Sequence, residues 1–235
     1  MELFYTDPEH ITGTDAEFDH FESQHILKTL RKKTGDEIHF TDGRGRLYSG
    51  IIDKTRPVLK VRHTLVKESA PSAVSVSLAV GFIRPARMDF IIEKGTELGV
   101  QKFYLLSTQH SNFFTANTLR WQKIARQAIK QSLHLFLPEI IAVKSLNKLI
   151  PLLPQSAVKM VFEQSAARLL SEILSRPDSL SSTIIIFLIG PEGGLSTAEI
   201  EFVQRNDFQP ISLGPYRLRT ETAALLAAAV GTFIK

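Results

Sequence analysis

A glycine-rich loop that separates an apolar run from a helix start signal could carry chemistry. Residues 184–189 are continuously apolar, and Gly190-Pro191-Glu192-Gly193-Gly194-Leu195 follows them. Glycine lets the backbone approach a ligand closely, and open α/β sheets bind ligands at the carboxyl ends of their strands. Ser196 and Glu199 then match a capping box that begins a helix. The stretch predicts a ligand-binding loop, and a tight turn with positive φ is the structural alternative.

A second loop of the same kind follows one strand later. A short apolar run at Ile211–Leu213 leads to Gly214, and polar residues 219–222 precede a helix of small and apolar residues. We expect Arg219 and Glu221 to lie where a helix N-terminus meets a strand end. The alternative for Glu221 is a capping or helix-dipole role, with Arg219 as its salt-bridge partner.

Several functional classes are disfavoured by what the sequence lacks. It contains neither G-x-x-x-x-G-K-[ST] nor G-x-G-x-x-G after the first strand, which disfavours nucleoside triphosphatases and dinucleotide enzymes. With no cysteine, disulfides, thiolate metal sites and cysteine nucleophiles are excluded. The seven histidines show no H-E-x-x-H spacing, so we predict no metal site.

The elements that position these loops indicate two domains within 235 residues. Residues 1–70 contain short β-type runs with Asp42-Gly43 as a hairpin turn, interrupted by one helical segment at 18–33. Residues 71–235 alternate strands with longer helical patterns, which predicts a mostly parallel sheet with helices on both faces. The predicted strands and helices of this α/β domain lie at 74–83, 87–98, 102–107, 118–134, 158–162, 168–175, 184–189, 197–205, 211–213 and 222–234.

The net charge of +4 is unevenly distributed. Residues 1–27 carry seven acids and no lysine or arginine. Residues 28–67 carry eleven basic and four acidic residues, and residues 84–148 carry ten and four. Two basic tracts of this kind are expected of a protein that binds a phosphate backbone, and two solvated faces are the alternative.

Four ordered motifs resemble the RsmE family, and the similarity extends over most of the chain. They are Glu93-Lys94-Gly95-Thr96-Glu97-Leu98-Gly99-Val100, the loop at 188–194, Leu213-Gly214-Pro215, and Leu218-Arg219-Thr220-Glu221-Thr222-Ala223. The resemblance implies an S-adenosylmethionine-dependent enzyme of the SPOUT class that methylates N3 of a uridine in small-subunit (16S) ribosomal RNA. It also implies a PUA-like N-terminal β-barrel that binds RNA, a C-terminal α/β trefoil knot, and a homodimer packed through knot helices.

The family motifs also assign site residues. The implied cofactor-binding residues are Leu188, Gly190, Pro191, Glu192, Gly193, Gly194, Leu195, Leu213, Gly214, Leu218, Arg219 and Thr222. Because uridine N3 must lose its proton, we expect Arg219 to stabilise negative charge on the base and Glu221 to orient it or accept the proton. A purely structural Arg219–Glu221 pair is the alternative.

The basic tracts supply the residues expected to bind RNA. These are Lys28, Arg31, Lys32, Lys33, Arg44, Arg46, Arg84, Arg87, Arg126, Lys130 and His134. Two positions depart from the family pattern. His134 stands where the family often has arginine. Before Leu218 the family commonly has an arginine and then an aliphatic residue, whereas this chain has Tyr216 and then Arg217, so the cation is displaced by one residue.

Three other functions stay open. They are a SPOUT methyltransferase acting on another RNA nucleotide, a non-catalytic RNA-binding protein of ribosome assembly, and a different α/β enzyme. The N-terminus has no signal-peptide pattern, and no apolar run reaches the ~20 residues that span a bilayer, so we expect a cytoplasmic protein without a membrane partner.

Overall fold

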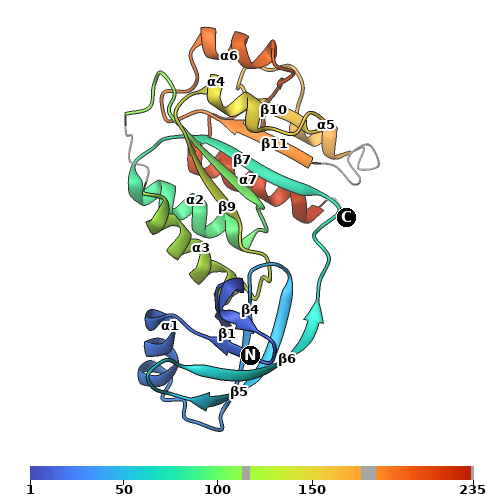
Figure 1. Cartoon of the computed structure of the whole chain (residues 1–235). Helices are drawn as coiled ribbons and strands as arrows, with labels where there is room; N and C mark the ends of the chain where they lie inside the picture. Colours follow the sequence, from blue (N-terminus) through green and yellow to red (C-terminus); the bar gives the residue numbers. More distant parts are fainter. Residues whose placement is uncertain (113–116, 176–183, 234–235) are drawn as a thin grey trace. The chain divides into compact units, whose positions relative to one another are not determined.

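A computed structural model describes residues 1–112, 117–175 and 184–233 (Figure 1). Contacts divide the chain into two compact units, residues 1–71 with 126–137 and residues 72–125 with 138–235. Helix α3 (Thr118–Ser132) therefore begins in the second unit and contributes its C-terminal part to the first. The predicted division into functional domains at residue 70 stays a prediction.

The first unit is a six-stranded sheet in the order β1-β4-β5-β6-β3-β2. Its strands are β1 (Leu3–Tyr5), β2 (Ile11–Thr12), β3 (Asp15–Glu17), β4 (Glu37–Thr41), β5 (Arg46–Lys54) and β6 (Lys60–Glu68). Strand β1 pairs with β4 in parallel, and the other neighbours are antiparallel. Phe4, Ile38, Phe40 and Val61 are among the buried residues of its core.

The predicted hairpin at Asp42-Gly43 is present between β4 and β5, although its loop extends to Gly45. Gly43 and Gly45 both have positive φ, and the Asp42 carboxylate accepts a hydrogen bond from the Arg44 backbone N–H at 2.8 Å. The side chain of an aspartate at such a position substitutes for a backbone acceptor.

The predicted helix over 18–33 is wrong at both ends. The Asp19 side chain caps α1 (His20–Gln24), and a π-helical turn, η2 (His25–Thr29), continues it. Arg31 then adopts a φ of 57°, which ends the helical path because the left-handed region interrupts right-handed turns. A 3-10 turn, η1 (Pro8–His10), completes the unit.

The second unit contains a six-stranded sheet in the order β12-β10-β11-β7-β8-β9, in which every neighbouring pair is parallel. The predicted parallel α/β arrangement is confirmed. The strands are β7 (Ser75–Gly81), β8 (Lys102–Leu106), β9 (Glu139–Val143), β10 (Val158–Phe162), β11 (Ile184–Ile189) and β12 (Gln209–Ile211). The helices are α2 (Pro85–Glu97), α4 (Leu146–Leu149), η3 (Ile150–Leu152), α5 (Leu170–Leu174), α6 (Thr197–Gln204) and α7 (Thr220–Phe233).

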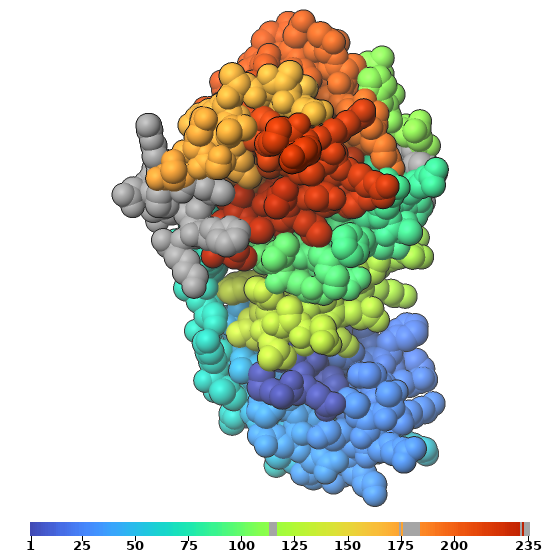
Figure 2. Space-filling view, turned by 180° about the vertical axis from the view of Figure 1, so that it is seen from behind, coloured from blue at the N-terminus to red at the C-terminus, as the bar shows by residue number. Residues whose placement is uncertain are grey.

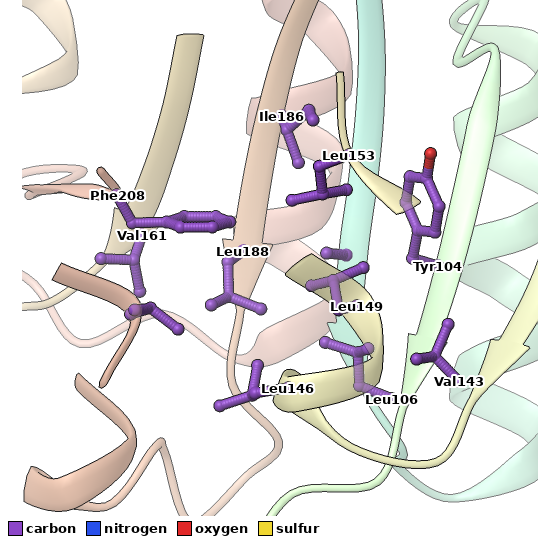
Figure 3. Packing of buried hydrophobic residues seen from close by; sticks show 12 residues of the cluster. Tyr104, Leu106, Val143, Leu146, Leu149, Leu153, Val161, Ile186, Leu188 and Phe208 are labelled. Carbon is purple, nitrogen blue, oxygen red and sulfur yellow. The ribbon is translucent and has the colours of Figure 1, made fainter. Parts of the chain in front are cut away.

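Helices cover both faces of this sheet. Helix α7 packs against α2, β7 and β11 on one face, and α4 contacts β8 and β9 on the other (Figure 1). Figure 3 shows the core beneath α4 and α6, where Leu146 and Leu149 meet strand residues such as Leu106 and Leu188. None of the helices in the described ranges is long and apolar enough to cross a membrane.

The predicted strands of this sheet differ from the structure at two places. Strand β9 was not predicted, and β12 spans Gln209–Ile211 rather than the predicted 211–213. Pro210 lies inside β12, which is tolerated because this strand is at the edge of the sheet.

Candidate functional site

Two loops meet at the carboxyl edge of the parallel sheet in the second unit. Residues 190–195 follow β11 in the centre of the sheet, and residues 212–219 follow β12 at its edge. Both lead into helices, α6 and α7. Because all strands are parallel, these loops lie on one edge, where open α/β sheets bind ligands.

The loops enclose a cavity of about 620 Å³. It is lined by Arg87, Phe162–Gln164, Ile189–Leu195, Ile211–Gly214 and Tyr216–Thr220 with Ala223. A volume of this size lies in the range of small-molecule and cofactor sites. Its walls combine backbone, apolar side chains and three arginines, which suits a ligand that has both apolar and polar parts.

Close backbone packing explains the need for glycine at position 190. A Cβ built on Gly190 would lie 2.9 Å from both Gly194 C and Leu195 N. Since both of those atoms belong to the backbone, the loop itself would have to move. Gly214, in the second loop, has a φ of 128°, which side-chain-bearing residues rarely adopt.

Hydrogen bonds at three places hold the glycine loop. Thr220 Oγ1 donates a hydrogen bond to Gly190 O at 3.0 Å, and His110 Nδ1 lies 3.2 Å from Gly194 O. The predicted capping box of Ser196 and Glu199 is confirmed, with both reciprocal bonds present. These bonds restrict the conformations of the loop, and such preorganisation lowers the entropic cost of binding a ligand.

The structure brings ten of the twelve predicted cofactor residues to this cavity. They are Gly190, Pro191, Glu192, Gly193, Gly194, Leu195, Leu213, Gly214, Leu218 and Arg219. Leu188 instead lies in the core under α4 and α6, and exposed Thr222 is not part of the lining. Cofactor binding by the ten stays a prediction.

Sequence reasoning missed the wall formed by Phe162, Glu163 and Gln164. These residues follow β10, which pairs in parallel with β11 and β12 and so ends at the same edge. The strand at 158–162 was predicted, but its place between β11 and β12 in the sheet was not. That place depends on strand order, which local sequence does not encode, so no local signal indicated this wall.

The proposed catalytic pair occupies two different environments. The Arg219 side chain is exposed, lines the cavity and makes no hydrogen bond or ion pair with another described residue. Glu221 is mostly buried outside the lining, and its Oε1 lies 3.7 Å from Arg87 Nε. The salt bridge found at Glu221 in the described chain is therefore with Arg87, not with Arg219.

The residues predicted to bind RNA differ in whether a carboxylate pairs with them. Arg46, Arg126 and Lys130 face the carboxylates of Glu68, Asp7 and Glu22 at 2.9, 2.9 and 2.7 Å. Another set is exposed and has no ion pair to a carboxylate in the part of the chain that the structure describes: Lys28, Arg31, Lys33, Arg44 and Arg84. Lys32 Nζ donates to Glu37 O at 3.4 Å, and His134 is half-buried. Arg87 belongs to the cavity.

The described residues also bear on whether the chain could hold a metal ion. Over residues 1–112, 117–175 and 184–233, no group of three His, Cys, Asp or Glu side chains is arranged to hold an ion.

Comparisons with known proteins match this architecture. A family model described as an RNA methyltransferase domain matches residues 70–231. The Bacillus subtilis protein named ribosomal RNA small subunit methyltransferase E is 32% identical over 222 residues, which is 88% of this chain and 85% of that protein.

Solved structures with a similar fold align with nearly the whole chain. The ribosomal RNA small subunit methyltransferase E of Neisseria gonorrhoeae, bound to S-adenosyl methionine, has a TM-score of 0.84 at 26% identity and covers 97% of this chain and 95% of its own. A probable rRNA-methyltransferase of Porphyromonas gingivalis has a TM-score of 0.83 at 28% identity, with 100% and 98% covered.

Proposed function

The chain belongs to the ribosomal RNA small subunit methyltransferase E family, and from this we propose that it methylates N3 of a uridine in small-subunit ribosomal RNA. S-adenosylmethionine is the methyl donor in this proposal. The observation that carries it is the match along nearly the whole chain to a relative solved with that molecule bound.

The cavity fits this cofactor. Its volume of about 620 Å³ suits a nucleoside with an amino-acid tail, and apolar walls such as Ile189 and Leu218 suit a flat base. The backbone N–H and C=O of Leu218 have no hydrogen-bond partner among the described residues, so they are available to the edge of an adenine. When bound, the cofactor supplies a methyl carbon activated by a neighbouring sulfonium.

Arg219 is the side chain best placed to act on the substrate base. Uracil N3 carries a proton, which must leave before the N3 lone pair attacks the methyl carbon. The resulting negative charge spreads over N3 and the two carbonyl oxygens. An exposed guanidinium in the cavity, which forms no ion pair with a carboxylate of the described residues, stabilises that charge.

The first unit serves as the RNA-binding domain in this proposal, as a PUA-like barrel over residues 1–70. Its six-stranded sheet and the unpaired cations Lys28, Arg31, Lys33 and Arg44 support this assignment. Residues 71–235 form the methyltransferase domain. Action on ribosomal RNA would place the protein in the cytoplasm.

A trefoil knot and a homodimer complete the proposal. After β12 at the sheet edge, the chain returns to the centre, where α7 packs on β7 and α2 and Thr220 bonds to Gly190. To thread α7 beneath the glycine loop, the chain must return from the edge of the sheet to its centre in this way. Helix α7 contributes to the surface in Figure 2, in red, and its exposed Leu226 suits a contact between two copies.

The test is transfer of labelled methyl groups from S-adenosylmethionine to small ribosomal subunits from a strain that lacks this gene. Modified nucleosides are then identified by mass spectrometry, and subunits from the parent strain, already methylated, are the matched control. N3-methyluridine in the first preparation alone supports the proposal. A different methylated nucleotide redirects it to another RNA target, and cofactor binding without transfer to either RNA contradicts it.

A further inference from the structure

Arg87 connects the two loops of the cavity through opposite charges. It lies in the first turn of α2, with Nη1 3.4 Å from Glu192 Oε1 in the glycine loop. Its Nε lies 3.7 Å from Glu221 Oε1 at the start of α7. One guanidinium on α2 therefore pairs with two other segments that are far apart in the sequence.

The pairing is partly shielded from solvent. The Glu221 side chain is 15% exposed, and Arg87 and Glu192 are each 32% exposed. Glu221 Oε2 is buried and has no hydrogen-bond partner in the described chain, so Arg87 is the cation that compensates this carboxylate. A partly buried carboxylate that loses its cation is strongly unfavourable.

The local charge argues against a phosphate as the partner of Arg87. Glu192 and Glu221 both pair with the Arg87 guanidinium, so their charges already compensate it. An arginine compensated in this way is less available to an RNA phosphate than an arginine without a carboxylate partner. RNA binding by Arg87 stays a prediction, and its two ion pairs and its place in the cavity favour a role in the cofactor site.

We propose that Arg87 is a positioning residue for the cofactor site: it holds the glycine loop and the start of α7 in the arrangement that binds S-adenosylmethionine. This inference rests on the proposed function. A planar guanidinium with several donors can serve both carboxylates at once, whereas a lysine ammonium is a single point charge. Glu221 then acts through Arg87 and not as a base.

The test measures S-adenosylmethionine affinity by calorimetry for a set of purified full-length variants. We expect Arg87→Met to weaken binding by about tenfold, because charged hydrogen bonds to two segments are lost. Arg87→Lys should fall between this variant and the wild type. Arg120→Met is the matched control. Arg120, on α3, pairs at 2.5 Å with Asp89, which lies on α2 as Arg87 does, but Arg120 does not line the cavity.

A second substitution separates positioning from a direct contact. In Arg87→Met, Glu221 is left as an uncompensated buried charge, so adding Glu221→Gln should restore part of the lost affinity and raise the melting temperature. If Arg87 instead contacted RNA phosphate, its loss would weaken RNA binding, leave cofactor affinity unchanged, and gain nothing from Glu221→Gln. That result overturns the inference.

Glu192→Gln keeps the test decisive if Arg87→Met fails to fold. Glu192 lies on a loop surface, and its neutralisation leaves Arg87 paired with Glu221, so the fold should persist while cofactor affinity falls severalfold. Unchanged cofactor affinity in Glu192→Gln would contradict the positioning role of Arg87. A wild-type protein that binds no S-adenosylmethionine overturns the proposed function as well, whereas wild-type affinity in the variants overturns this inference alone.

Discussion

Thr220 Oγ1 donates a hydrogen bond to the carbonyl oxygen of Gly190 at 3.0 Å, and so joins the first residue of α7 to the first residue of the glycine loop. The Thr220 side chain is buried. The bond satisfies a carbonyl that the close packing of Gly190 on Gly194 and Leu195 holds in place. The glycine loop and the start of α7 are thereby joined by this side-chain-to-backbone bond as well as through Arg87.

Replacing Thr220 by valine should destabilise the protein and weaken cofactor binding. Valine keeps the shape but removes the donor, which leaves the Gly190 carbonyl unsatisfied at a cost of about 1 to 3 kcal/mol. Urea unfolding measures the loss of stability, and calorimetry with S-adenosylmethionine measures the loss of affinity. Thr220→Ser retains the hydroxyl and is expected to remain close to the wild type in affinity.

Gly190→Ala should reduce cofactor affinity more than it reduces stability. The new Cβ would meet backbone atoms at 2.9 Å, so the loop must shift, and the loop is the cavity wall. Gly13→Ala is the control, because Gly13 also resists substitution, through its φ of 57°, but lies in a turn of the other unit. Equal cofactor affinity in Gly190→Ala and the wild type would contradict this prediction.

Local sequence predicted the parts of the site whose signals are local. The strand at Ile184–Ile189, the capping box of Ser196 and Glu199 and the glycines of both loops need only short-range pattern and backbone freedom. Ten of the twelve cofactor residues that the family resemblance implies line one cavity. Leu188 is the informative failure: side chains alternate along a strand, and its side chain points into the core beneath α4 and α6.

The remaining features depend on contacts between distant segments. Arg87 and Glu221 meet only after α2 and α7 pack on the same face of the sheet, so a basic tract at 84–148 gave no indication of that pair. Likewise, Arg126 and Lys130 extend a predicted RNA surface by charge alone, whereas the folded chain pairs them with Asp7 and Glu22. Strand β9 was missed because Glu139–Val143 is short and its place is defined by pairing with β8.

The stability of the first unit should decrease as the pH falls below about 6.5, the ordinary pKa of histidine. Burial lowers the pKa of His63, whose ring packs edge-on against the stacked rings of Phe40 and Tyr48, while Asp15 partly opposes this shift. The folded state thus binds fewer protons than the unfolded state over this interval, and stability rises with pH until both forms are neutral. Urea midpoints measured between pH 5 and 8 check this.

His63→Phe should flatten that pH dependence, because phenylalanine fills the aromatic cluster without titrating. His20→Gln, at an exposed position, should retain the wild-type dependence. A midpoint that falls equally with pH in His63→Phe and the wild type would assign the effect to other groups.

Removing unpaired cations should weaken RNA binding more than removing paired ones. Alanine at Lys28, Arg31 and Lys33 together is expected to lower affinity for ribosomal RNA and to reduce the salt slope by up to about 2, because each phosphate contact releases counterions. Lys130→Ala should instead reduce stability by about 1 to 3 kcal/mol, since Glu22 loses its cation in a mostly buried site. Fluorescence anisotropy at several salt concentrations, with urea unfolding alongside, separates the two effects.

Arg219→Ala should lower turnover by about 100-fold, because the guanidinium is expected to stabilise charge in the transition state. The folded state should persist, because this side chain is exposed and makes no ion pair with another described residue. Arg219→Lys keeps the charge without the fork geometry and should recover part of the rate. Arg217→Ala is the neighbouring control, since Arg217 is also exposed and lines the same cavity. Single-turnover methyl transfer at saturating cofactor isolates the chemical step from binding. A wild-type rate in Arg219→Ala would remove Arg219 from catalysis and leave stabilisation of the uracil anion to Arg217 or to backbone groups of the glycine loops.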